Sequence, residues 1–171
     1  MEVLSSIIQI TKDTAIRGKS RIAICAGYGV SCEGWLKVEL LDELTKAFYH
    51  DETIEILPEW KKHDLLIRRS LPAESYLIEL KTFPTNYMRG GKPITNFVNS
   101  VILDLKKLSE KRRDSTIGLE IWMAYVIPDP IPNAWWSHLN KIKSFSGRML
   151  LDERIPLWNY AFANLYIMQS K

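Results

Sequence analysis

The sequence contains few of the residues that build soft-metal sites and covalent cross-links. Its 171 residues include only two cysteines, Cys25 and Cys32, and three histidines, His50, His63 and His138. The cysteines have neither the spacing of a zinc site nor the number that a disulfide framework needs, so we expect free thiols in a reducing compartment. The histidines are scattered along the chain, which argues against a catalytic site based on histidine.

Long apolar runs are also missing. No stretch approaches the roughly eighteen consecutive apolar residues of a membrane helix, and residues 1–6 lack the basic start and apolar stretch of a signal peptide. We therefore expect a cytoplasmic protein with no membrane partner. A phosphate-binding loop is excluded as well, because Gly18-Lys19-Ser20 has Asp13 where the first glycine of that motif would stand.

The chain has little net charge. Its 23 basic and 20 acidic residues leave a formal charge of +3, which does not by itself indicate a nucleic-acid partner. The basic residues are clustered, however: Lys61 and Lys62 precede a predicted strand, and Arg89 and Lys92 enclose two glycines that let the backbone approach an anion. We expect these four residues to contact phosphates. The basic run within residues 106–113 fits phosphate contact and helix-dipole compensation equally well.

Among the residues that are present, the segment 76–82 is the most informative. It sets Glu79 and Lys81 two residues apart in an apolar run that is typical of a strand. Side chains alternate between the two faces of a strand, so Glu79 and Lys81 should share one face. Two further acids precede them: Asp64 opens a second apolar run, and Glu39 lies in a predicted helix.

Three acids and one lysine suit metal-assisted hydrolysis of a phosphodiester. Mg²⁺ prefers oxygen ligands and is usually held by one or two carboxylates together with water and phosphate oxygens. Asp64 and Glu79 on neighbouring strands would suffice, with Glu39 completing or orienting the metal shell and Mn²⁺ as a substitute ion. Lys81 near the attacking water would position it and stabilise charge on the phosphate.

This arrangement resembles the PD-(D/E)XK superfamily of nucleases, also called restriction-endonuclease-like. The core of that family is a helix with a glutamate, a hairpin whose second strand starts with an aspartate, a strand with (D/E)-x-K, a helix and a fourth strand. The matching segments cover roughly residues 33 to 127 and are, in chain order, Glu39 in 35–44, Asp64 in 63–69, Glu79-Leu80-Lys81 in 76–82, the helix 95–111 and the strand 117–127. His63 replaces the proline that precedes the family's aspartate.

The resemblance implies a fold and an activity. It implies an α/β protein with a single mixed sheet flanked by helices, an αβββαβ core at about 33–127, an N-terminal helix and a C-terminal extension at 128–171, all in one domain over 1–171. It also implies a magnesium-dependent endonuclease that hydrolyses DNA, with Glu39, Asp64, Glu79 and Lys81 as catalytic residues. A second copy of the chain is a further candidate partner.

The remaining segments follow ordinary periodicity. Helical spacing predicts a helix over residues 2–16, and the extension should contain a helix at 134–141 and a strand within 157–168. A strand at 53–57 should pair with the Asp64 strand through a turn at Pro58. The six tryptophans are interpreted as packing residues in preference to base-stacking residues.

Several alternatives remain for the site. Glu33 and Glu43 can replace Glu39, and Glu43 lies one helical turn beyond it. His63 is interpreted as structural, because alternation sends it to the face opposite Asp64. The whole domain could instead be a nuclease fold with weak or lost catalysis that binds nucleic acid or a protein partner. The acids could also form a plain network of surface ion pairs, which contribute little to stability.

Overall fold

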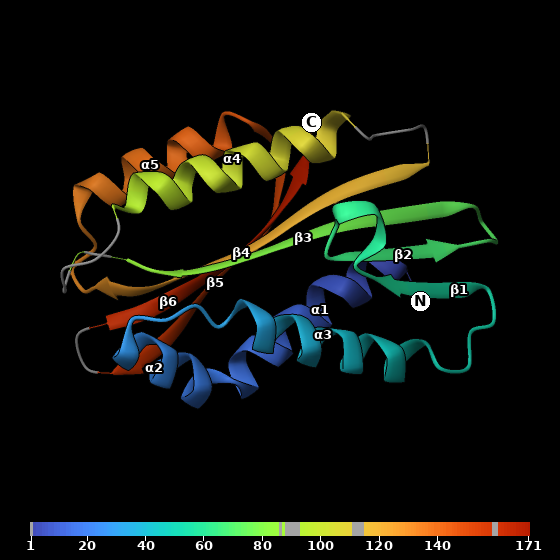
Figure 1. The fold of residues 1–171 in the computed structure, drawn as a ribbon, viewed down its shortest axis with the longest axis horizontal. Coiled ribbons are helices and arrows are strands. Elements are labelled where there is room, and N and C mark those ends of the chain that lie inside the picture. The colour runs from blue at the N-terminus through green and yellow to red at the C-terminus, as the bar shows by residue number, and fades with distance from the viewer. Residues whose placement is uncertain (1, 86, 88–92, 111–114, 159–160) are drawn as a thin grey trace.

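The chain forms helices first and then a sheet interrupted by two further helices. The structure is a computed structural model that describes residues 2–85, 87, 93–110, 115–158 and 161–171 (Figure 1). The helices are α1 (Val3–Arg17), α2 (Lys19–Tyr28), α3 (Glu33–Phe48), α4 (Ile94–Glu110) and α5 (Asn133–Lys143), with a short 3-10 turn at Trp60–Lys62. The strands are β1 (Ile54–Pro58), β2 (Leu65–Arg69), β3 (Glu74–Pro84), β4 (Thr116–Pro128), β5 (Ser146–Trp158) and β6 (Ala161–Ser170).

The strands form one mixed sheet in the order β1-β2-β3-β4-β6-β5. β3 and β4 are parallel and are joined by α4, whereas all other neighbours are antiparallel. A parallel pair needs a long crossover connection, and α4 supplies it. The predicted α/β class with a single mixed sheet is therefore confirmed.

Helices cover both faces of the sheet (Figure 1). α1, α2 and α3 lie on one face, and α4 and α5 lie on the other. On the first face the buried stripe of α3, Leu36, Leu40 and Leu44, belongs to the same apolar cluster as Ile78 and Leu80 of β3. The second face carries an aromatic layer in which Trp122 stacks on Tyr166 with ring centroids 4.2 Å apart, next to the rings of Phe83 and Trp135. Packing is thus confirmed as the role of Trp122 and Trp135, which are fully buried.

Periodicity predicted most elements within a few residues, but it missed two. No element was predicted for α2, because its apolar residues form only a short run at 22–26. β5 was hidden because it is the edge strand of the sheet and carries the charged segment Asp152-Glu153-Arg154, so its face pattern is weak. Three register shifts along its pairing with β6 further break the two-residue alternation on which recognition of a strand depends.

Two expectations drawn from the composition can be compared with the structure. Cys25 and Cys32 are both free thiols. Within the part of the chain that is described, no helix combines the length and the apolar character needed to cross a membrane.

Candidate active site

The edge of β3 beyond the end of β2 is lined by carboxylates. The ladder between the two strands ends at the pair Leu65 and Ile78, while β3 continues to Pro84. The backbone N–H of Leu80 then donates to Oδ2 of Asp64 at 2.8 Å, and the N–H of Thr82 donates to Oε2 of Glu33 at 3.3 Å. Two acidic side chains thus take the place of a neighbouring strand and accept the hydrogen bonds of the backbone N–H groups of β3.

Glu79 and Lys81 lie on the face of β3 that is covered by α4. Glu79 is only 6% exposed and accepts a hydrogen bond from the ammonium group of Lys107 in α4. Lys81 lies 3.3 Å from the carboxylate of Asp104, one turn earlier in the same helix. The shared face that strand alternation predicts is therefore present, and Leu80 between them packs on the opposite face.

Asp64 connects this strand to helix α3. Its Oδ1 lies 2.8 Å from Nζ of Lys37, and the same ammonium group lies 2.5 Å from Glu59. These bonds to Asp64 and Glu59 raise the pKa of Lys37, so it is firmly cationic. Asp64 is thereby fixed against the amide of Leu80, the residue between Glu79 and Lys81.

Burial changes the acid-base behaviour of the cluster. It raises the pKa of Glu79 to about 7, with Lys107 opposing the shift and Asp104 and Asp64 adding to it. Burial likewise raises the pKa of Glu33, against the charge of Lys81. Glu79 can therefore exchange a proton near neutral pH.

Lys81 keeps its charge in the same surroundings. Burial favours the neutral amine, but the carboxylates of Asp104 and Glu33 outweigh that effect and the pKa of Lys81 is raised. Lys81 is therefore an ammonium ion at neutral pH and is suited to stabilise negative charge.

His63, which the sequence analysis left out of the candidate site, contacts one of its acids. Its Nδ1 lies 2.6 Å from Oε1 of Glu79, and the side chain is almost fully buried. β2 begins at Leu65, so His63 lies in the turn before the strand, where the alternation of side chains along a strand does not apply. Its position next to Asp64 in the sequence was the only signal.

Glu120 was also missed by the sequence argument. It is the register partner of Glu79 on β4, it is fully buried, and neither of its carboxylate oxygens has a hydrogen-bond partner. Burial, together with the charges of Asp104 and Glu79, raises its pKa well above the usual range, so ionisation of this carboxyl group is disfavoured. A lone acid within the apolar run 117–127 was the signal that could have revealed it.

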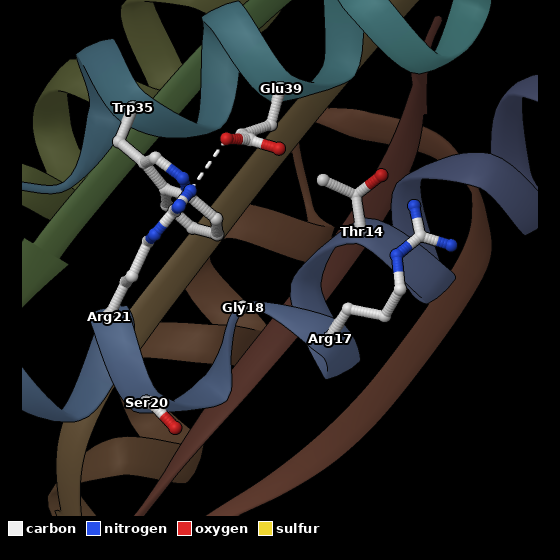
Figure 2. A pocket seen from close by; sticks show the side chains of 7 residues that line it. All are labelled: Thr14, Arg17, Gly18, Ser20, Arg21, Trp35 and Glu39. Carbon is white, nitrogen blue, oxygen red and sulfur yellow. Dashed lines mark hydrogen bonds and ion pairs between the residues drawn. The ribbon is translucent and has the colours of Figure 1, made fainter.

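Glu39 does not join this cluster. Figure 2 shows it pointing from α3 towards Arg21 of α2, and the two side chains are 2.6 Å apart. Lys37 and Glu39 are two residues apart and so about 200° apart around the helix, which directs them to opposite sides. Lys37 faces Asp64, so Glu39 faces away from it.

Glu33 and Glu43, the two alternatives to Glu39, lie on different sides of α3. Glu33 precedes Lys37 by one turn and reaches β3 at Thr82. Glu43 lies on the side of Glu39 and pairs with Arg17 at 2.6 Å. Glu33 is thus the acid of α3 that the fold brings to the cluster.

The pocket next to Glu39 has a volume of about 280 Å³. Its arginines are already neutralised, because Arg21 pairs with Glu39 and Arg17 with Glu43. The residues that line it come from α1, α3 and the start of α2: Thr14, Arg17, Gly18, Ser20, Arg21, Trp35 and Glu39 (Figure 2).

The predicted phosphate contacts divide into two groups. Lys61 and Lys62 are exposed in the turn that leads to Asp64, and the carbonyl of Lys62 accepts a hydrogen bond from Lys107. Arg89 and Lys92 lie outside the described residues. Only the first pair can therefore be related to the acid cluster.

A divalent cation would have to use few protein ligands here. The described part of the chain contains no group of three or more acid, histidine or cysteine side chains arranged to hold a metal ion. Mg²⁺ does not need such a cage, since one or two carboxylates suffice when water and phosphate oxygens complete its shell. Asp64 and Glu79 supply oxygen donors of that kind.

Comparison of the chain with protein families, with curated proteins and with solved structures finds no significant match in any of the three.

Proposed function

We propose that this protein is a metal-dependent nuclease that hydrolyses phosphodiester bonds of DNA. One observation carries the proposal: Asp64 is bonded to the backbone of Leu80, the residue between Glu79 and Lys81. Asp64 therefore lies at the same part of β3 as Glu79 and Lys81, which supports a common site for the three charged side chains. The succession of α3, β1, β2, β3, α4 and β4 also agrees with the order of elements in the restriction-endonuclease-like core, which further supports the proposal.

Asp64 and Glu79 would hold Mg²⁺, with Mn²⁺ as a substitute. The ammonium groups of Lys37 and Lys107 pair with Asp64 and Glu79 and compensate their negative charge. A bound divalent cation would compensate the same charge. A bound Mg²⁺ would supply an acidified water and neutralise charge on the leaving oxygen.

The protein's own groups would orient the reaction. Lys81, kept as an ammonium ion by Asp104 and Glu33, stabilises the charge that develops on the phosphate and orients the attacking water. Glu33 takes the place that the sequence argument gave to Glu39, as the third acid near Lys81. His63 and Lys107 fix the carboxylate of Glu79.

The test is cleavage by the purified full chain with Mg²⁺, Mn²⁺ or chelator. Substrates should include supercoiled, linear, branched and single-stranded DNA, with RNA as a comparison. We expect Asp64→Ala and Glu79→Ala to weaken metal binding measured by calorimetry. Lys81→Ala should keep the metal and slow the chemical step by on the order of a hundredfold or more.

Asp42→Ala is the matched control for each preparation. Asp42 is an acid of the same region, but it lies on the exposed side of α3 and pairs with Lys46. Its loss should leave cleavage unchanged. Equal activity in all preparations, including the three site variants, would show a contaminating nuclease and overturn the proposal.

A second candidate function is a nucleic-acid or protein binding module with the same fold and no cleavage. The observation that favours it is the saturation of the acids, because Asp64 is already paired with Lys37 and Glu79 with Lys107 and His63. Binding of DNA without cleavage under every metal condition would select this function.

A further inference from the structure

A pocket of about 390 Å³ adjoins the candidate active site. His63 lines it and also contacts Glu79, so the pocket and the site share a wall. Its volume lies within the roughly 300–1,000 Å³ that is usual for ligand sites. The lining residues come from the turn before β2 and from β2, β3 and β4: Trp60, Lys61, His63, Leu66, Arg68, Ser75, Leu77 and Thr116.

The floor of the pocket is apolar and one wall is aromatic. Leu66 and Leu77 are buried beneath it together with Leu108 of α4, and the indole of Trp60 packs against this cluster. Trp60 itself is only half-buried. A flat apolar group could therefore rest on the leucines and stack on the indole. Nucleobases stack on aromatic side chains in this way.

The charged lining of the pocket is positive. The ammonium group of Lys61 lies 4.5 Å from the centre of the Trp60 ring, and Arg68 stands at the exposed rim, where it pairs with Glu55 at 3.1 Å. Ser75 and Thr116 add hydroxyl groups, and among the described residues that line the pocket there is no acid. A ligand with an apolar face and a negative group next to it fits this combination.

The turn that carries Trp60 is conformationally strained. Glu59, Lys61 and Lys62 all have positive φ angles, of 52°, 46° and 73°, which are costly for residues with side chains. Such strain persists where surrounding contacts impose it, often at functional sites. Here the contacts are those of the candidate site: Lys37 holds Glu59, and Lys107 bonds both the carbonyl of Lys62 and Glu79.

We infer that this pocket binds an unpaired nucleobase of the strand that is cleaved, stacked on Trp60, with a neighbouring phosphate on Lys61. The inference rests on the proposed function and names its substrate class. A base within a duplex is stacked and paired, so it cannot enter a pocket of this kind. The preferred substrate is therefore DNA with a single-stranded or branched segment, and a blunt duplex is a poor one.

The test is binding to fluorescently labelled DNA in chelator, where cleavage does not interfere. A short single strand, a blunt duplex of the same sequence and that duplex with an unpaired end are compared by anisotropy. Wild type should prefer the first and third. Trp60→Ala should weaken binding to these two by about ten- to a hundredfold, the range of a lost base stack, and leave duplex binding nearly unchanged.

Three further variants separate stacking from folding. Trp60→Phe should retain much of the preference, because a phenyl ring still stacks. Trp136→Ala is the matched control, since Trp136 is an exposed tryptophan of α5 and lines no part of the pocket. If Trp60→Ala fails to fold, Lys61→Glu at the exposed turn replaces it and should weaken single-strand binding and reduce its salt dependence.

The outcomes distinguish the pocket from the nuclease. Equal binding of single strand and duplex, with no effect of Trp60→Phe, Trp60→Ala or Lys61→Glu, overturns the pocket, while cleavage by wild type would still support the proposed function. A preference for unpaired DNA that depends on Trp60, without cleavage in any metal, supports the pocket and removes the nuclease. Absence of any DNA binding overturns both.

Discussion

Glu79 and Glu39 are both glutamates bonded to a cationic side chain, but they differ in what surrounds the pair. The side chain of Glu79 is 8% exposed and lies between Lys107, His63 and the buried Glu120. The side chain of Glu39 is 37% exposed and that of its partner Arg21 is 58% exposed. Charges interact strongly where water is excluded and weakly where it is present. A glutamate bonded to a cation is therefore a buried group with a raised pKa in one place and an exposed ion pair in the other.

The largest expected difference between the two glutamates concerns cleavage. Glu79→Gln removes a proposed metal ligand and should lower the rate of DNA cleavage by on the order of a hundredfold or more. Glu39→Gln should leave the rate within about twofold of wild type, because Glu39 contacts no residue of the cluster. Rates are measured side by side at saturating Mg²⁺.

The reverse order of effects would break the comparison. Loss of activity in Glu39→Gln with full activity in Glu79→Gln would move the catalytic site to the pocket between α1, α2 and α3 (Figure 2).

The second expected effect is a pH dependence of stability that Glu79 introduces. Its folded-state pKa of about 7 lies above the usual 4.5, so its contribution to stability is present below pH 4.5 and lost as the pH rises through 7. Relative to Glu79→Gln, wild type should lose about 3 kcal/mol of unfolding free energy between pH 4.5 and 8. Urea unfolding of both proteins across this range measures it.

Parallel stability curves for the two proteins would mean that Glu79 ionises in the usual range. Glu39→Gln is the control for the same substitution at an exposed ion pair.

The third effect concerns Glu120, the extreme case of burial. Replacing it by methionine removes a buried carboxyl group without hydrogen-bond partners. This should raise the unfolding free energy by about 1–3 kcal/mol at pH 8. The gain should be smaller at pH 5. At that pH part of the unfolded population still carries this proton, so the preference of the folded state for the protonated carboxyl group costs less stability than at pH 8. Thermal and urea unfolding at both pH values test it.

A lower stability of Glu120→Met at pH 8 would contradict this account and indicate that Glu120 holds the cation of Lys81 in place. Glu39→Met serves as the exposed counterpart and should change stability by less than about 1 kcal/mol.

The smallest effect should come from the exposed pair itself. Arg21 lies over the Trp35 ring at 5.5 Å and pairs with Glu39. A double-mutant cycle with Arg21→Ala and Glu39→Ala should give a coupling energy of about 0.2–1 kcal/mol that falls with added salt. A coupling well above that range would show that the pair is shielded from water and would narrow its contrast with Glu79.

Much of the fold could be predicted from patterns of residues that are close together in the sequence. The apolar stripe of α4 and the nearly continuous burial of β4 each follow from residue order within a single element. The common face of Glu79 and Lys81 follows in the same way, because alternation along a strand is a property of the backbone. By contrast, the edge strand β5 is pinned to β6 by an irregular register, which no periodicity in its own residues reveals.

Which side chains surround Glu79 in the candidate site depends on the tertiary structure. Burial of Leu36, Leu40 and Leu44 sets the rotation of α3, which turns Glu33 towards β3 and Glu39 towards Arg21. The sequence by itself determined which strand carries an acid and a lysine on one face, because that depends on neighbours two residues apart. Only packing between distant elements decided that His63, Lys107 and Glu120 surround Glu79, because those contacts join residues 16 to 41 positions away along the chain.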